Sequence, residues 1–345
     1  MSLHKWFKII DPRTTESVHQ KFTKEIPGYF YLKWKVNETP TCTFLENKPL
    51  QYTFIKKIKW RNFREIVLYG DIEGSNSKPV LKLRRQHFTA FRNVPLLKSH
   101  LQKCIRRGEV DKAVMTAYYL LEKDEGQFLR RLPIIVVEDV CLIAQFPILI
   151  WLMVAYPNYQ LYNNQKRWLL GLIVQLTKYP HQELMVQDEI SRLVEEKVLE
   201  SLLPQFLKLD KNQQTMALSL LLRKSYGGLK GDGYLLQHFF QLHVSQTLRH
   251  LPTLQFNPVY IIKLLLSDEM EICGADFHCF PQILGKLHQQ YPDYTDDILK
   301  EVIWSCSSSL NFRTPHVPSE KDLCIWGEIQ QSFEKLAFQL ILRRC

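Results

Sequence analysis

The spacing of apolar residues changes once along the chain, and this change most constrains the fold. In the first part, Phe30, Leu32, Trp34 and Val36 alternate with Tyr31, Lys33 and Lys35, as expected for strands with one apolar face and one basic face. From Pro95 onward, apolar residues recur at helical spacing. The sequence therefore predicts an α+β protein, in which a small antiparallel β-rich N-terminal domain precedes a large all-α helical array.

The domain boundary is expected where this spacing changes. We place a basic β-rich domain at residues 1–92 and a helical domain at residues 93–345, with a possible subdivision near 180–210. The first domain contains four runs with strand character, separated by turn residues, at 30–36, 52–60, 65–72 and 80–88. We expect four or five short antiparallel strands that form a small sheet or open barrel.

The remainder of the chain divides into helical segments of ten to twenty residues with short connections. The first ends at Gly108, the second starts at Asp111, and Pro133 interrupts the third, which spans 128–140. Further helices are predicted at 146–156, 163–179, 182–208, 211–225, 232–250, 257–267, 279–291, 294–307 and 320–344. The segment 307–315 between the last two is interpreted as an ordinary surface loop.

The positive charge of the chain is confined to its first quarter. Residues 1–92 contain 18 Lys and Arg against 8 Asp and Glu, whereas the whole chain contains 45 against 35. The helical remainder is therefore neutral, with 27 of each sign. A surplus restricted to one module is typical of a site for a polyanion such as nucleic acid.

Basic and aromatic residues of the predicted strands form the candidate nucleic-acid site. Cations there would follow phosphates, and rings would stack on bases of a single strand. The alternative is that these lysines only solubilise the sheet and protect its edges. The candidates are Tyr31, Lys33, Lys35, Lys56, Lys57, Lys59, Arg61, Arg64, Lys82, Arg84 and Arg85.

A glycine-rich segment at 225–233 is a second candidate site. It contains Gly227, Gly228 and Gly231 together with Lys230. Backbone without side chains can approach a phosphate or a partner protein closely. The same composition also suits a flexible connection between helices, and the sequence leaves both readings open.

The acidic pair Glu138 and Asp139 lies among apolar residues. Buried carboxylates need partners, and Arg130 and Arg131 precede them by one to two helical turns. We expect these four residues to form a structural ion network, although a functional network is an open alternative.

Catalytic signatures are absent from the sequence. It contains neither a Walker A loop nor the other common catalytic motifs, so we expect no cofactor and a non-enzymatic protein. Cys273, His278 and Cys279, with a fourth ligand such as His288, are a weak zinc candidate, and we expect no metal. The carboxylate pairs at 188–189, 195–196 and 296–297 are interpreted as exposed helix faces rather than magnesium ligands.

The compartment is expected to be intracellular, either cytoplasmic or nuclear. The N-terminus lacks the features of a secretory signal, and the eight cysteines form no disulfide framework. The most apolar stretch, 132–156, contains Glu138, Asp139 and two prolines. A buried helical hairpin therefore explains it better than a membrane span.

Two helical stretches resemble a known family. Residues 97–114 contain Leu-Lys-Ser-His-Leu-Gln-Lys-Cys-Ile-Arg-Arg followed by Asp-Lys-Ala-Val, and residues 128–140 run from Phe-Leu-Arg-Arg-Leu to Glu-Asp-Val. Their order and spacing resemble the helical region after the ATPase core in the MgsA/RarA family of AAA+ proteins, the Werner-helicase-interacting relatives of clamp loaders. The resemblance covers 97–140 and extends more weakly to 180.

The resemblance implies an oligomer that works at replication forks. ATP hydrolysis does not carry over, because only 92 residues with strand character precede the helices. Our first hypothesis is a non-enzymatic nucleic-acid-binding protein of DNA replication or repair, with single-stranded DNA as the favoured ligand. We expect it to form homo-oligomers, to contact replication or repair proteins, and to have no membrane partner. The alternatives are a helical protein-interaction scaffold and an unrecognised metal-dependent nuclease.

Overall fold

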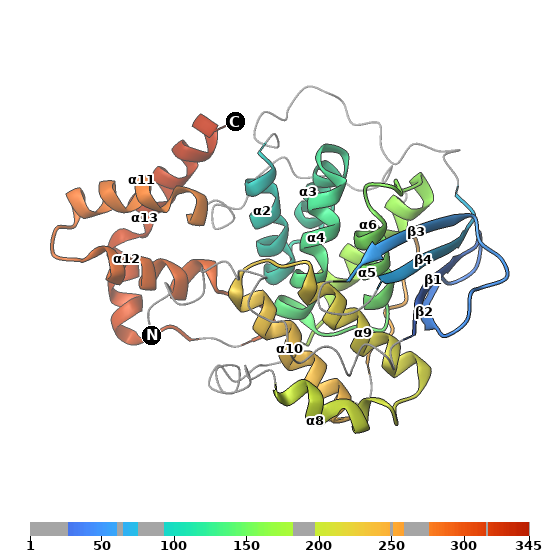
Figure 1. Cartoon of the computed structure of the whole chain (residues 1–345). Helices are drawn as coiled ribbons and strands as arrows, with labels where there is room; N and C mark the ends of the chain where they lie inside the picture. The colour runs from blue at the N-terminus through green and yellow to red at the C-terminus, as the bar shows by residue number, and fades with distance from the viewer. Residues whose placement is uncertain are drawn as a thin grey trace. The chain divides into compact units, whose positions relative to one another are not determined.

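The structure, a computed structural model, describes residues 27–60, 65–74, 93–181, 197–248, 251–258, 276–314 and 317–344. A small N-terminal sheet is followed by helices, which confirms the predicted α+β class (Figure 1). The described residues form two compact units, each assembled from separate segments of the chain. Unit 1 draws on Met1–Asn76, Leu132–Tyr162 and Glu183–Leu254, and unit 2 draws on Ser77–Arg131, Asn163–Gln182 and Gln255–Cys345.

These units cross the boundary predicted at residue 92. The sheet belongs to unit 1 together with helices that lie far along the chain. The predicted boundary follows charge and apolar spacing, which are local properties, whereas the units follow packing. The basic β-rich domain at residues 1–92 stays a prediction.

The sheet contains four described strands in the order β2-β1-β4-β3. They are β1 (Tyr29–Trp34), β2 (Thr41–Leu45), β3 (Phe54–Lys59) and β4 (Glu65–Ile72). β1 and β4 pair in parallel, with Tyr31 opposite Tyr69, while the two outer pairs are antiparallel. The sheet is therefore mixed, and the prediction of a purely antiparallel sheet was wrong. Chain order alone does not determine which strands meet in the middle.

Three of the four predicted strands have a counterpart in the structure. Strand β2 was not predicted, because its residues Thr-Cys-Thr-Phe-Leu show only weak alternation. The strand predicted at 80–88 lies outside the described residues. The predicted runs 30–36, 52–60 and 65–72 correspond to β1, β3 and β4.

One face of the sheet is buried against helix α5 (Phe146–Ala155) and helix α9 (Lys211–Ser225), as Figure 1 shows. Phe30, Leu32 and Leu68 on this face have no exposed surface. The indole Nε1 of Trp151 donates a hydrogen bond of 3.1 Å to the carbonyl of Phe30. Gly70 permits this approach, because a Cβ there would lie 3.1 Å from Cη2 of Trp151. We call this side the inner face and the opposite side the outer face.

Helix α9 also covers the edge strand β2. The backbone N–H of Phe44 donates a hydrogen bond of 3.0 Å to the hydroxyl of Thr215. This bond satisfies a donor that an edge strand would otherwise expose, and exposed edges promote unwanted pairing. Residues 211–225 were predicted as a helix with these bounds, and Asp210 caps it through hydrogen bonds to the amides of Asn212 and Gln213.

Unit 1 also contains α8 (Lys197–Phe206) and α10 (Lys230–Val244), which contact each other. Helix α10 starts two residues earlier than predicted, since the Asp232 carboxylate accepts a hydrogen bond from the amide of Leu229. The segment before α5 is a short π-helix, η4 (Val136–Val140), that continues α4 (Glu125–Ile135). Pro133 lies inside α4, so the predicted interruption occurs after it, in the wider π turn.

Unit 2 contains α2 (Val94–Arg107), α3 (Val110–Lys123) and α6 (Asn163–Lys178), which pack together. Gly108 ends α2 with a left-handed φ of 77°, and its N–H and that of Glu109 bond to carbonyls of the last turn. The predicted stop at Gly108 is confirmed. This conformation favours glycine because it has no Cβ.

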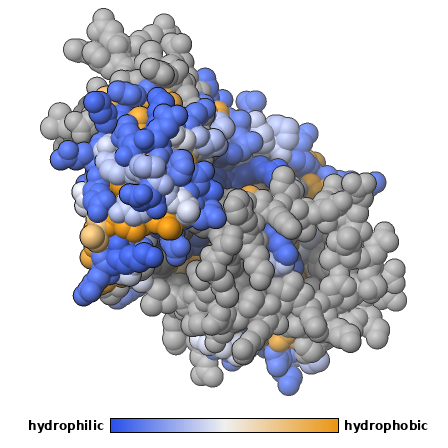
Figure 2. Space-filling model, turned by 90° about the vertical axis from the view of Figure 1, so that its left-hand side faces the viewer, coloured by the Kyte–Doolittle hydropathy of each residue, from blue (hydrophilic) through white to orange (hydrophobic). Residues whose placement is uncertain are grey.

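The C-terminal helices of unit 2 have a core of their own. They are α11 (Asp276–Gln290), α12 (Asp296–Ile303), the π-helix η7 (Trp304–Ser308) and α13 (Glu320–Arg344). Ile283, Val302, Ile329 and Phe333 are among the buried residues of this core. Among the residues coloured in Figure 2, hydrophilic ones predominate, with a band of hydrophobic residues between them. Leu323 and Phe338 are exposed large apolar residues of α13.

The apolar stretch 132–156 spans α4, η4 and α5, and every residue of α5 is buried. In the described part of the chain, no helix has both the length and the apolar character needed to cross a bilayer.

Candidate nucleic-acid interface

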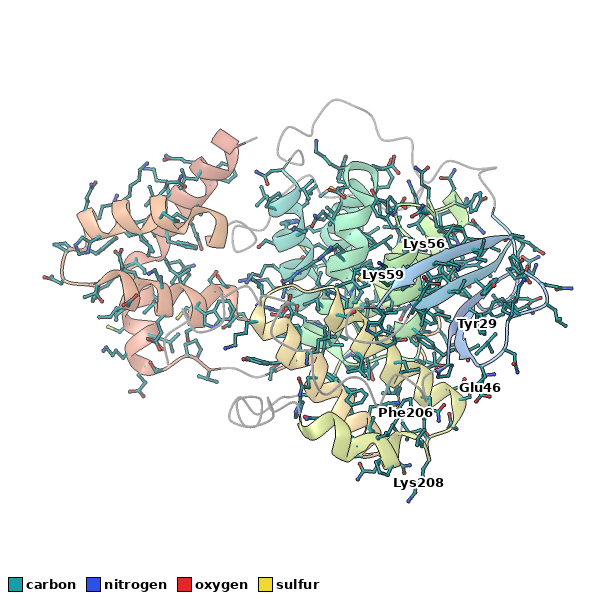
Figure 3. The ribbon with its side chains drawn as sticks, in the orientation of Figure 1. Tyr29, Glu46, Lys56, Lys59, Phe206 and Lys208 are labelled. Atoms are coloured by element: carbon teal, nitrogen blue, oxygen red, sulfur yellow. The ribbon has the colours of Figure 1, made fainter. Side chains whose placement is uncertain are left out.

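The alternation of side chains along β3 divides its lysines between the two faces of the sheet. In a strand, neighbouring residues point to opposite sides. Lys57 and Lys59 share the outer face with Tyr31 and Lys33, whereas Lys56 shares the inner face with Ile58. Figure 3 labels Lys56 and Lys59 on this strand. The sequence analysis grouped these three lysines as one site, and the structure separates them.

Lys56 caps a helix. Its Nζ donates hydrogen bonds of 2.9, 3.2 and 3.1 Å to the carbonyls of Val154, Ala155 and Tyr156, at the C-terminus of α5. An ammonium group has three protons, so all of its donors are engaged. A positive charge at a helix C-terminus is also favourable for the helix dipole. Burial lowers the pKa of Lys56. We therefore remove Lys56 from the candidate phosphate contacts.

Three other lysines of the candidate set have carboxylate partners. Lys33 pairs with Glu38 at 2.7 Å, and Lys57 pairs with Glu65 at 3.3 Å. Both of these pairs are exposed, so a phosphate can compete for the lysines at little cost. Hydrogen bonding to Glu38 raises the pKa of Lys33. These lysines remain available to a polyanion.

Lys35 is held more firmly than Lys33 and Lys57. Its Nζ lies 2.8 Å from the buried carboxylate of Asp71 and 3.1 Å from that of Glu73. Hydrogen bonds to both carboxylates raise the pKa of Lys35. Removing its ammonium from Asp71 would leave a buried charge without its partner, which is costly. Lys35 is therefore a poor phosphate ligand.

Lys59 and Lys48 complete the cations of the outer side. Among the residues that the structure describes, Lys59 has no carboxylate within 4.0 Å, and its side chain is exposed. Lys48 lies in the loop after β2, with its Nζ 5.1 Å from the ring centre of Tyr52. Sequence reasoning missed Lys48, because it lies outside the predicted strands.

The outer face also carries tyrosines that sequence reasoning missed. The rings of Tyr29 and Tyr69 have centres 5.8 Å apart, and those of Tyr52 and Tyr69 are 4.7 Å apart at an angle of 70°. Tyr31 lies opposite Tyr69 in the neighbouring strand. Burial, followed by the charge of Asp71, raises the pKa of Tyr31, so its hydroxyl stays protonated at neutral pH. The alternation that identified Tyr31 also pointed to Tyr29, two residues earlier.

The described part of the sheet is close to neutral. Residues 27–60 and 65–74 contain six Lys against five Asp and Glu, whereas the N-terminal 92 residues contain 18 Lys and Arg against 8. Arg61, Arg64, Lys82, Arg84 and Arg85 belong to the remaining stretches and lie outside the described residues. Most of the charge that motivated the nucleic-acid prediction is thus contributed by these stretches.

The glycine-rich candidate site is mainly the start of a helix. Gly227 and Gly228 have φ values of 73° and 142°, and the carbonyl of Gly227 accepts a hydrogen bond of 2.9 Å from Arg223. Lys230 and Gly231 lie in the first turn of α10. The Nζ of Lys230 lies 5.3 Å from the ring centre of Tyr234. These contacts explain the segment as a helix connection, and its predicted role in binding a phosphate or a partner remains untested.

The predicted ion network remains a prediction. Arg131 donates a hydrogen bond to the side chain of Gln102 within unit 2. Asp139 is buried, with 1% of its surface exposed, in the π-helix η4 of unit 1. Arg130 and Glu138 also have interactions of their own.

The side chains of the candidate zinc ligands Cys273, His278 and Cys279 do not belong to the described part of the chain. No group of three His, Cys, Asp or Glu side chains is suitably placed there. The Nδ1–H of His288 donates a hydrogen bond of 3.0 Å to the carbonyl of Tyr294. Asp296 and Asp297 occupy the first turn of α12, in agreement with their interpretation as partners of the helix dipole.

Comparisons with known proteins leave the predicted resemblance to the MgsA/RarA family as a prediction. The two stretches that carry it correspond to α2, the start of α3, α4 and η4. Family membership stays a proposal. No family model matches the chain, and neither a curated protein nor a solved structure matches it.

Proposed function

We propose that this protein binds nucleic acid through its N-terminal part, without catalysing a reaction. The observation that carries the proposal is the coincidence of two features in the first 92 residues. They contain the whole net positive charge of the chain, and their sheet presents tyrosines and lysines on one face. Cations supply affinity for phosphates, and rings supply affinity for bases.

The exposed lysines of the outer face support this proposal in a specific way. Within the described residues, the carboxylate partners of Lys33 and Lys57 are exposed, and the side chain of Lys59 on the same face is also exposed. Exposed ion pairs contribute little to stability, so exchanging a carboxylate for a phosphate does not disturb the fold. The described cations can therefore serve as ligands without loss of structure.

The test should use the full-length chain rather than a deletion of residues 1–92. The deletion would expose Trp151 and the other residues of α5 that pack on the inner face, and a loss of binding would then be ambiguous. We would reverse the charges of Lys82, Arg84 and Arg85 to Glu. The matched control reverses Lys208, Lys321 and Lys335, which are exposed and lie elsewhere.

Binding to labelled single-stranded DNA, RNA and duplex DNA would be followed over a salt series. The slope of log affinity against log salt is negative, and each lost phosphate contact makes it less steep by about 0.7 for a single strand. If all three residues contact phosphates, the triple variant makes the slope less steep by about 2, and the control triple leaves it unchanged. Equal losses in both triples, or no binding by the wild-type chain at low salt, would contradict the proposal.

A role in DNA replication or repair and assembly into homo-oligomers belong to the same proposal. They are supported by the resemblance of residues 97–140 to the helical region of the MgsA/RarA family. Light scattering of the purified chain, with and without single-stranded DNA, tests the oligomer. A monomer under both conditions would remove this part of the proposal and leave nucleic-acid binding as a separate question.

A further inference from the structure

We infer that the outer face of the sheet is a stacking surface for unpaired bases, with Tyr52 as its main ring. Single strands would bind there through their bases, while most phosphate contacts come from other parts of the N-terminal 92 residues. This inference rests on the proposed function and deepens it, because it names the ligand as single-stranded nucleic acid and assigns its bases to a defined surface.

The arrangement of the rings is the first argument. Tyr69 is almost fully buried, with 4% of its surface exposed, and it lies beneath Tyr29 and Tyr52. Tyr52 has 39% of its surface exposed, and Ile55, opposite Tyr69 in β3, has 50%. Tyr69 thus supports more exposed side chains in a fixed position. A fixed, accessible ring loses little conformational entropy when a base stacks on it.

The cation beside Tyr52 is the second argument. Lys48 has an exposed side chain, and its Nζ lies 5.1 Å from the ring centre of Tyr52. A hydrogen bond with the Tyr52 hydroxyl raises the pKa of Lys48. A base that stacks on this ring displaces the lysine only locally, and the ammonium group then lies beside the phosphate of the same nucleotide. One ring and one cation together match one nucleotide.

The charge balance is the third argument. Six Lys face five acidic residues in the described part of the sheet, so its net charge is too small to hold a polyanion electrostatically. What this surface offers in excess is aromatic and apolar area. In a duplex the bases are already stacked on one another, and a sheet with rings on it fits splayed, unpaired bases. The surface therefore favours single strands.

The experiment compares two oligonucleotides of equal length, one of thymidylate and one abasic, which has the same phosphates without bases. The full-length protein is expected to bind the thymidylate strand at least about tenfold more tightly, since stacking on a protein ring contributes that order of affinity. Y52A is expected to remove most of this preference and to leave the salt slope unchanged. Y52F is expected to keep the preference, because phenylalanine stacks as well.

A matched control exists within the same unit. Tyr234 carries Lys230 at 5.3 Å, which is nearly the geometry of Lys48 on Tyr52, but this pair lies on α10. Y234A should leave the preference for bases intact. Circular dichroism of each variant confirms that the fold is retained.

The outcomes separate this inference from the function on which it rests. Equal binding of both oligonucleotides overturns the stacking surface and leaves nucleic-acid binding standing. Loss of the preference in Y234A as well as Y52A also overturns it. If neither oligonucleotide binds at low salt, the proposed function itself fails, and the apolar tyrosine surface would then be a docking site for protein.

Discussion

The two faces of the N-terminal sheet use similar residues for different purposes. On the inner face, the ammonium group of Lys56 donates three hydrogen bonds to carbonyls at the end of α5. On the outer face, the next lysine in the chain, Lys57, has one exposed carboxylate partner. A lysine therefore stabilises the fold where tertiary packing surrounds its ammonium group with carbonyl acceptors. Its neighbours in the sequence do not reveal this.

A second basic residue extends the comparison into unit 2. Arg313 lies in the segment 307–315, which the sequence analysis interpreted as an ordinary surface loop. Its guanidinium donates hydrogen bonds to the carbonyls of Ile105, Tyr179, Thr177 and Leu176, and it lies 4.2 Å from the ring centre of Phe312. The loop thereby supplies hydrogen-bond donors to carbonyls at the C-termini of α2 and α6, and it links these two helices.

The largest expected loss of stability comes from a substitution on the inner face of the sheet. Phe30→Ala removes a side chain with no exposed surface and leaves a cavity next to the stacked ring of Phe44. We expect a loss of about 3–5 kcal/mol in the free energy of unfolding, measured by urea denaturation. Ile55→Ala on the outer face is the control, and its effect should be small, because Ile55 is half exposed. Similar losses in both variants would contradict the assignment of the two faces.

Arg313→Met should have the next largest effect. The change introduces an apolar side chain of similar length and removes the hydrogen-bond donors for four backbone carbonyls. We expect unfolding free energy to fall by about 2–3 kcal/mol, since hydrogen bonds to charged groups are among the stronger ones. Lys321→Met, at an exposed position of α13, is the control. A surface-loop role for Arg313 would be indicated if the two variants were equally stable.

Lys56→Met and Lys57→Met compare the two faces of the sheet at neighbouring positions of one strand. Lys56→Met leaves three carbonyls at the end of α5 without their donor, which should cost about 1–2 kcal/mol of unfolding free energy. Lys57→Met removes only an exposed ion pair, and its stability should match the wild type. In nucleic-acid binding the order should reverse, with the Lys57 variant weakened more. Denaturation midpoints and binding affinities of both variants provide the check.

A pH effect of smaller size should come from the inner parts of unit 1. His243 is buried, and burial lowers its pKa below the ordinary value of 6.5. The unfolded chain therefore takes up a proton at higher pH than the folded chain. Stability from this group is present above about pH 6.5 and falls as the pH drops toward the folded-state pKa, where it levels off.

The His243 effect is measured as the difference in unfolding free energy between neutral and mildly acidic solution, and the free energy should be lower in the acidic solution. The imidazole Nε2 lies 3.0 Å from the carbonyl of Gln213. In His243→Gln, whose amide can donate to the same carbonyl, this part of the pH dependence should disappear. An unchanged pH profile in that variant would assign the dependence to other groups.

Much of the fold could be predicted from the sequence, because the relevant signals are local. The spacing of apolar residues predicted β4 at 65–72, α9 at 211–225 and α13 at 320–344 with the bounds that the structure has. Gly108 was predicted as a helix stop, and its left-handed φ explains why. Strand alternation likewise predicted one apolar face for Phe30, Leu32, Trp34 and Val36. The first three are buried, whereas Val36, beyond the end of β1, is 51% exposed.

Much less of the candidate site could be predicted. Lys48 lies in a loop without a periodic pattern, and Tyr52 lies at the start of the predicted strand 52–60 but precedes β3. Only the tertiary structure places Tyr52 beside Tyr69 and Lys48 beside Tyr52. The parallel pairing of β1 with β4 joins strands that β2 and β3 separate in the chain, and local alternation does not reveal such a pairing.

By itself, the sequence determined where helices and strands form and where positive charge is concentrated, since these depend on neighbours within a few residues. The tertiary structure decided which cations are structural. The carbonyls that hold Lys56 come from residues about 100 positions away, and those that hold Arg313 come from residues at separations of 134 to 208. Hydrogen-bond acceptors at such separations leave no periodic signal in the chain, because their meeting depends on how the helices pack.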